Sequence, residues 1–294
     1  MRQFAGVGVA LITPFNDDKT IDFAALEQLV DKCCREGADY LVVLGTTGEA
    51  ATLTAAEKLQ VIASCKKANN QRLPLVLGIG GNNTHAVVDD LKNTDLEGFS
   101  AILSVTPYYN KPSQTGLYLH YKALAEATPL PIILYNVPGR TGINLSAETT
   151  LKLAHEFPQI FIAIKEASGN LGQIAYIVRD RPTHFAVISG DDNLTLPSMA
   201  LGADGAISVS ANCFTKTFCN MIHLCQEGNF TAAAPLNLKL HEATDLLFAE
   251  GNPTGAKAAL AIKGEVKNNL RLPLVSSTEQ LYEQIKQQIA TYEI

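Results

Sequence analysis

Lys165 is the strongest candidate for a reactive residue, because it lies in the otherwise apolar run "FIAIKEAS" at 161–168. Removing an ammonium group from water is costly unless the charge is paired or neutralised. Glu166 could pair with it, but adjacent side chains of a strand point to opposite faces. The alternative is a reactive amine. Burial favours the neutral form, and a neutral amine can attack a ketone to form a Schiff base.

Hydroxyl and guanidinium groups follow other apolar runs of the chain. They are Thr46 and Thr47 in "GTTGE", Tyr108 and Tyr109 in "TPYYNKPSQ", and Tyr135 and Arg140 in "YNVPGRTG". Tyrosine and threonine hydroxyls can relay protons, and arginine suits bidentate capture of a carboxylate. Taken singly, each group also has an ordinary interpretation: a turn for the threonines, rim packing for the tyrosine pair and a surface charge for the arginine.

Eight apolar runs predict the strands that position these groups. They span 7–13, 38–45, 73–80, 100–107, 131–138, 161–168, 184–190 and 205–211. The runs are almost continuously apolar, as expected of parallel strands covered on both faces. Their starts lie roughly 20–35 residues apart, about the length of one strand plus one helix.

Helical patterns fill the intervals between the runs. Thr54 and Glu57 have capping-box spacing, and Ser146 is the predicted N-cap of a later helix. Eight strand–helix units predict a (β/α)8 TIM barrel of the α/β class. A doubly wound open sheet is the alternative, but "GIGGNN" at 78–83 lacks the third glycine of a dinucleotide-binding turn.

Three helices are predicted after the last strand, at 231–249, 254–269 and 277–292. We therefore expect a catalytic barrel over residues 1–225 and a C-terminal helical domain over residues 226–294. In a barrel of this kind the active site lies at the carboxyl ends of the strands. The polar motifs follow that rule, and Lys165 lies at the end of the sixth run.

A metal site is not expected. Asp191 and Asp192 in "SGDDN" suit capping of the following helix better than metal binding, and the six histidines show no helical pairing. The chain is 47% hydrophobic with a net charge of −6 and no basic stripe, so nucleic acid is not an expected partner. No segment is apolar over the ~20 residues that span a bilayer. Six cysteines without a C-x-x-C pair predict reduced thiols in a cytoplasmic protein.

The combined motifs resemble those of the dihydrodipicolinate synthase family, within the class I pyruvate-dependent aldolases. The resemblance runs from "GVGVALITPF" to "NPTGAKAAL" at 252–260, and includes "IKEASGN" and "SGDD" in the family's order. It implies a lyase of lysine and diaminopimelate biosynthesis. Such an enzyme condenses pyruvate with L-aspartate 4-semialdehyde through a lysine Schiff base and needs no metal or organic cofactor.

The resemblance also implies a role for each matching residue. Lys165 would form the Schiff base, and Tyr135 would carry protons to and from it. Thr46 would connect Tyr135 to Tyr109, which would enter from a neighbouring subunit of a homotetramer built as a dimer of dimers. The groups expected to hold substrate are the side chains of Thr47 and Arg140 and the main chain of Gly190 and Ile207.

Some positions depart from the family pattern. Lysine-inhibited relatives carry histidines and a glutamate where this chain has Ala55, Lys58 and Ala86, so we expect weak or absent inhibition by lysine. Gly255 replaces a common proline, a change that we interpret as structural. The nearest alternative activity is that of N-acetylneuraminate lyase or a keto-deoxy sugar acid aldolase, which share the lysine and tyrosine but usually lack the arginine loop. A barrel that binds a ligand without turnover is the more distant alternative.

Overall fold

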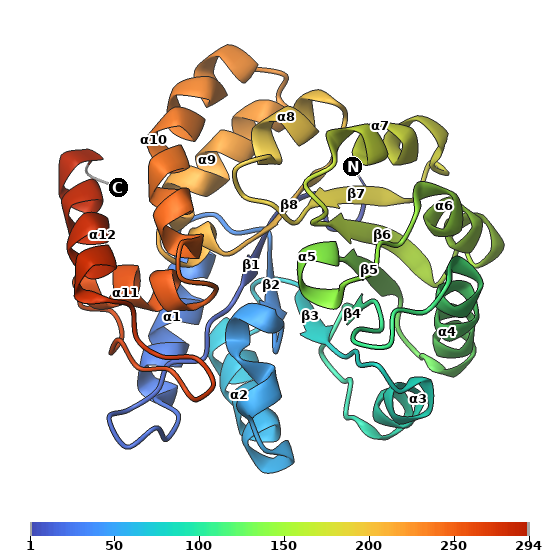
Figure 1. The fold of residues 1–294 in the computed structure, drawn as a ribbon, viewed down its shortest axis with the longest axis horizontal. Coiled ribbons are helices and arrows are strands. Elements are labelled where there is room, and N and C mark those ends of the chain that lie inside the picture. Colours follow the sequence, from blue (N-terminus) through green and yellow to red (C-terminus); the bar gives the residue numbers. More distant parts are fainter. Residues whose placement is uncertain (1, 293–294) are drawn as a thin grey trace. The chain divides into compact units, whose positions relative to one another are not determined.

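Eight strands form a closed barrel in which each strand neighbours the next along the chain (Figure 1). The computed structural model describes residues 2–292. The strands are β1 (Gly6–Ala10), β2 (Tyr40–Val43), β3 (Leu75–Gly78), β4 (Ala101–Val105), β5 (Ile132–Asn136), β6 (Phe161–Glu166), β7 (Ala186–Ser189) and β8 (Gly205–Ser208). Each predicted run overlaps one strand, and the barrel prediction is confirmed.

Helices follow the strands and continue beyond the last one. They are α1 (Phe23–Arg35), α2 (Ala55–Asn69), α3 (Thr84–Asn93), α4 (Gln114–Ala127), α5 (Pro138–Thr141), α6 (Ala147–Glu156), α7 (Leu171–Asp180), α8 (Thr195–Ala200), α9 (Thr215–Gln226), α10 (Phe230–Phe248), α11 (Thr254–Ile262) and α12 (Glu279–Tyr292). Short 3-10 turns cover Thr46–Gly48 (η1), Ala50–Thr52 (η2) and Ser210–Asn212 (η3). No helix within residues 2–292 is long and apolar enough to cross a bilayer.

Local capping explains where several helices begin. The Thr54 side chain accepts from the Glu57 backbone N–H, and the Glu57 carboxylate accepts from that of Thr54, which completes the predicted capping box of α2. Ser146 caps α6 by accepting from Thr149, also as predicted. Helix α8 differs from expectation, because its N-cap is Leu194. The Asp191 carboxylate accepts from the N–H of Leu194, which is the N-cap residue itself. No side chain of residues 2–292 caps the first turn of α8.

Helix α11 is shorter than predicted. It ends at Ile262 instead of residue 269. Gly264 follows with φ +73°, a left-handed conformation that commonly ends helices and that glycine adopts without steric strain. At its other end, a Cβ atom on Gly255 would lie 2.5 Å from the Leu247 carbonyl oxygen. Gly255 therefore allows α11 to approach the backbone of α10, in agreement with its structural interpretation.

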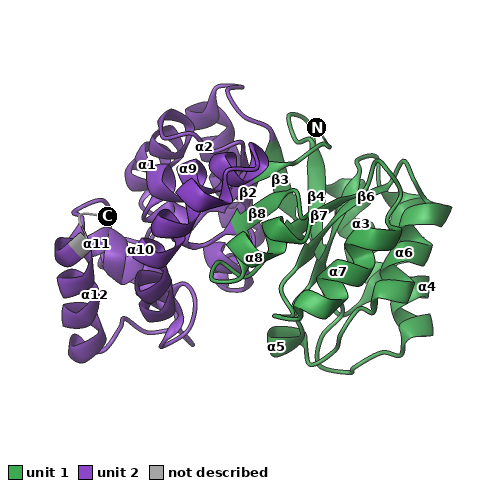
Figure 2. Cartoon of the chain, turned by 90° about the horizontal axis from the view of Figure 1, so that it is seen from above, with its two compact units in different colours: residues 1–6, 75–207 green, residues 7–74, 208–294 purple. Residues whose placement is uncertain are grey.

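The chain divides into two compact units, coloured separately in Figure 2. Unit 1 comprises residues 1–6 and 75–207, and unit 2 comprises residues 7–74 and 208–294. In unit 1 the pairings from β3 through β8 are all parallel, and in unit 2 β1 pairs with β2 in parallel. Also in unit 2, α10 packs against α9, α11 and α12.

The expected division into a barrel of residues 1–225 and a helical domain of residues 226–294 stays a prediction. Residue 1 and residues 293–294 of those ranges lie outside the described part of the chain. Strands β1, β2, β5 and β7 are buried along their whole length. This burial accounts for the near-continuous apolar runs, because both faces of each strand are covered.

Candidate active site

Lys165 is a buried lysine without an acidic partner. It lies in β6 with 6% of its surface exposed, and no residue of 2–292 forms an ion pair or hydrogen bond with its ammonium. A purely structural lysine in such a place would be expected to hold a carboxylate. The ammonium therefore occupies a costly position that packing alone does not explain.

Tyr135 is an aromatic neighbour of this amine. It lies in β5 directly opposite Lys165 in the parallel register, and the Lys165 Nζ is 4.5 Å from the centre of its ring. Side chains paired across neighbouring strands point to the same face, so the phenol and the amine share one environment. A tyrosine hydroxyl in that environment can carry protons for chemistry on the lysine.

Gly190 follows β7 and leaves room for the lysine side chain. A Cβ atom at this position would lie 2.7 Å from Ala167 Cβ, 2.9 Å from Lys165 Cε and 3.0 Å from Lys165 Cγ. Ordinary carbon contacts are ~3.5–4.0 Å. Glycine is thus required sterically beside Lys165, a reason that differs from the main-chain contact with substrate expected from the sequence.

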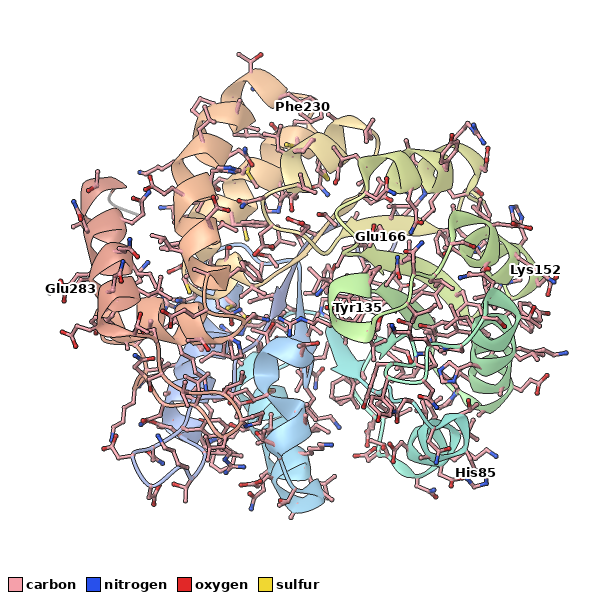
Figure 3. The ribbon with its side chains drawn as sticks, in the orientation of Figure 1. His85, Tyr135, Lys152, Glu166, Phe230 and Glu283 are labelled. Carbon is pink, nitrogen blue, oxygen red and sulfur yellow. The ribbon has the colours of Figure 1, made fainter. Side chains whose placement is uncertain are left out.

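Glu166 points away from Lys165 and holds the neighbouring loop. Its buried carboxylate accepts from the Asn136 amide at 3.0 Å, from the Gln173 amide at 2.8 Å and from the Ser168 N–H at 2.8 Å. The side-chain oxygen Oδ1 of Asn136 accepts in turn from the Leu145 N–H at 2.9 Å. Tyr135 and Glu166 are labelled in Figure 3. Amide donors, not the lysine, therefore satisfy this carboxylate, and the pairing of Lys165 with Glu166 is excluded.

Arg140 lies on the loop that this network anchors. The loop contains the short helix α5, whose capping residue Gly142 has φ +71°. The Arg140 side chain is exposed, and among residues 2–292 it has no ion-pair partner. An exposed, unpaired guanidinium on an anchored loop is available to bind an anionic ligand.

Ile207 and Tyr109, both in unit 1, differ in solvent exposure. Ile207 is almost fully buried in β8. Tyr109, after β4, is 88% exposed with φ +78°, a left-handed conformation that is uncommon outside glycine. No residue of 2–292 contacts the Tyr109 side chain through a described hydrogen bond or ring contact.

Thr46 and Thr47 lie in unit 2, in η1 after β2. Thr46 is exposed, whereas Thr47 is buried and its Oγ1 accepts a hydrogen bond from the Asn252 amide at 3.0 Å. Two residues further on, the Glu49 carboxylate is 2.5 Å from the Lys257 ammonium and accepts from the Arg271 N–H at 3.1 Å. The segment 252–257 at the start of α11 therefore contacts the loop of residues 46–49 at two points.

Sequence reasoning did not identify Glu166, Asn252 or Lys257 as functional. Glu166 was considered only as a partner of Lys165, and the other two lie in "NPTGAKAAL", which contributed only to the resemblance. The available signal was the presence of polar residues within otherwise apolar motifs, because such residues are seldom buried without a partner. Burial lowers the pKa of the Lys257 ammonium, and Glu49 opposes that shift. Lys257 is fully buried, so this paired lysine is a poor nucleophile.

Metal ions and thiols offer no alternative chemistry among residues 2–292. No group of three histidine, cysteine, aspartate or glutamate side chains there could hold a metal ion. All six cysteines are free. Burial raises the pKa of Cys33 and of Cys65 to about 12, which keeps these thiols protonated and unreactive near neutral pH.

Comparisons with known proteins agree on one family. The model of the dihydrodipicolinate synthetase family matches residues 3–292. A 4-hydroxy-tetrahydrodipicolinate synthase of Parabacteroides distasonis is 52% identical over 282 residues, which cover 96% of this chain and 95% of that protein. The fold is similar to that of a chloride-inhibited dihydrodipicolinate synthase from Acinetobacter baumannii complexed with pyruvate. That structure has a TM-score of 0.95 and 40% identity, with 99% of this chain and 100% of the other covered.

A further similar structure bears on the number of subunits. It is described as a monomeric dihydrodipicolinate synthase variant, has a TM-score of 0.95 and is 36% identical, with 99% of this chain and 97% of the other covered. Similarity to solved structures therefore does not by itself give the number of subunits.

Proposed function

This chain belongs to the dihydrodipicolinate synthetase family, whose members are pyruvate-dependent lyases, and we propose that it condenses pyruvate with L-aspartate 4-semialdehyde through a Schiff base on Lys165. The product is the 4-hydroxy-tetrahydrodipicolinate for which its relatives are named, on the route to diaminopimelate and lysine. The observation that carries this proposal is the buried, unpaired Lys165 ammonium beside the Tyr135 ring.

The reaction begins with the neutral Lys165 amine attacking the ketone carbon of pyruvate. The carbinolamine loses water to give an imine, and the methyl group then loses a proton to give an enamine. The enamine carbon forms a bond to the aldehyde carbon of the second substrate, whose oxygen takes up a proton. The amine of that substrate finally displaces Lys165 from the imine and closes a six-membered ring. The lysine serves as the electron sink, so no metal or organic cofactor takes part.

Tyr135 moves protons in this scheme. Its position opposite Lys165 in the parallel register supports this role. Thr46 connects Tyr135 to Tyr109, and Thr47 donates to the pyruvate carboxylate. Arg140 binds the carboxylate of aspartate semialdehyde with its exposed guanidinium. The main chain of Gly190 and of Ile207 contacts the bound pyruvate. These roles rest on the family resemblance together with the local settings of the residues.

The functional unit is a dimer within a homotetramer, because Tyr109 serves the active site of a neighbouring subunit. Its exposed side chain and its left-handed backbone support this proposal, since no described hydrogen bond or ring contact within residues 2–292 involves the Tyr109 side chain. The enzyme works in the cytoplasm with its thiols reduced.

A trapping experiment tests the reaction. The protein is incubated with pyruvate, reduced with borohydride, digested and analysed by mass spectrometry. We expect a pyruvyl adduct on Lys165, none on the buried Lys257, and none anywhere in the Lys165→Met variant. Pyruvate should be consumed only when aspartate semialdehyde is present. Absence of an adduct would favour a binding protein without turnover, and cleavage of N-acetylneuraminate or a keto-deoxy sugar acid would favour the alternative lyases.

A mixing experiment tests the role of Tyr109. The variants Tyr109→Phe and Lys165→Met should each be nearly inactive. If the tyrosine acts across a dimer, hybrids of the two contain one site with both native residues. Random mixing should then restore about a quarter of the native activity. If Tyr109 acts within its own chain, mixing restores none.

A further inference from the structure

Asn252 is a buried asparagine with a single described hydrogen bond, and that bond goes to Thr47. It lies immediately before the Pro253 N-cap of α11, is 7% exposed, and donates from Nδ2 to Thr47 Oγ1 at 3.0 Å. The two residues are 205 positions apart in the sequence and belong to the same compact unit. The Asn252 Oδ1 is buried with no hydrogen-bond partner in residues 2–292.

The direction of this bond determines what the Thr47 hydroxyl can still do. A threonine hydroxyl has one proton to donate and two lone pairs that accept. The Asn252 amide occupies a lone pair, and no acceptor within residues 2–292 takes the Thr47 proton. The hydroxyl is therefore left with a proton to give to an anionic group of a ligand.

We propose that Asn252 is a positioning residue that holds the Thr47 hydroxyl as a hydrogen-bond donor toward the carboxylate of pyruvate. This inference rests on the proposed function, because it assigns a helper to the residue that would bind that carboxylate. It also explains the unpartnered Oδ1. Turning the amide to use its oxygen here would make Thr47 donate to Asn252 and leave no proton for the substrate.

A second contact holds the same loop against the same helix. Lys257 reaches Glu49 at 2.5 Å, donates to the Asn269 carbonyl oxygen at 2.9 Å and lies 4.0 Å from the centre of the Phe15 ring. Breaking a buried ion pair is unfavourable, because it leaves a charge without a partner. The loop that carries Thr47 thus has a fixed position relative to Asn252, and the hydroxyl direction is set before pyruvate arrives.

Two substitutions of Asn252 test the direction of its hydrogen bond to Thr47. Asn252→Ala removes the donor, and we expect the KM for pyruvate to rise about tenfold with kcat changed less than about twofold, the effect of weakening one charge-assisted hydrogen bond. Asn252→Asp can only accept, so it takes the Thr47 proton and adds a negative charge. Its KM for pyruvate should rise further than that of the alanine variant. A native-like KM in the aspartate variant would overturn the proposal.

Asn229→Ala is the matched control. Asn229 caps α10 by accepting from the Ala232 N–H in the same unit, so its loss should lower the melting temperature without changing the KM for pyruvate. If the two alanine variants lose similar stability and neither changes that KM, Asn252 is a structural residue only.

A double-mutant cycle with Thr47→Val shows whether Asn252 acts through Thr47. In the Thr47→Val background, Asn252→Ala should change the KM for pyruvate by less than about twofold, because the hydroxyl it directs is gone. Effects that multiply independently would refute the inference. Trapping with the native enzyme separates the proposed function from the proposed role of Asn252. Failure to trap pyruvate on Lys165 overturns both proposals. Normal trapping, together with an unchanged KM for pyruvate in Asn252→Ala, overturns only the role of Asn252.

Discussion

Gly190→Ala should damage the reaction by displacing Lys165. The added Cβ would lie 2.9 Å from Lys165 Cε and 2.7 Å from Ala167 Cβ. Relief to an ordinary contact of about 3.6 Å requires the lysine side chain or its surroundings to move by roughly 0.7 Å. A displacement near 1 Å at a reacting atom can cost about 100-fold in rate, or about 2.7 kcal/mol in activation free energy.

The first chemical step gives the most direct assay of Gly190→Ala. We expect the rate of borohydride-trapped adduct formation with pyruvate to fall by about 100-fold, and kcat/KM with it. Overpacking should also lower the free energy of unfolding by about 1–3 kcal/mol, measured by urea titration. Gly139→Ala is the control, since a Cβ there meets no atom within 4 Å. A Gly190→Ala enzyme that traps pyruvate at the native rate would refute the steric argument.

Three further predictions concern stability, substrate binding and regulation. Burial lowers the pKa of His120 from 6.5 to about 4, so the folded state favours the neutral imidazole. Its contribution to stability is complete above pH ~6.5 and is lost as the pH falls towards 4, up to about 3 kcal/mol; urea titrations across that range should show less pH dependence in His120→Gln. Glu166→Gln should raise the KM for aspartate semialdehyde and destabilise the fold by about 2 kcal/mol, because the new amide donors meet existing ones; unchanged kinetics would contradict its role in holding the Arg140 loop. Lysine should inhibit weakly or not at all, and sub-millimolar inhibition of the purified enzyme would disprove that.

Local patterns in the sequence determined the elements of this fold. Burial on both faces makes a strand apolar along its length, so all eight strands were visible as runs. The caps at Thr54 and Ser146 involve residues within three positions of each other, and both were predicted correctly. The end of α11 was placed seven residues too late, because "NPTGAKAAL" continues into a sequence compatible with a helix and only the left-handed Gly264 stops it.

The partners of the buried polar groups were decided by tertiary structure alone. Strand alternation showed that Glu166 points away from Lys165, but not that amides from Asn136 and Gln173 would satisfy it. Lys165 stood out in the sequence because its strand is apolar, whereas its contact with Tyr135 depends on the register between β5 and β6. Asn252 meets Thr47 across 205 positions of chain. A residue type and its local pattern specify what a side chain can do, and the packing of distant segments selects which partner it meets.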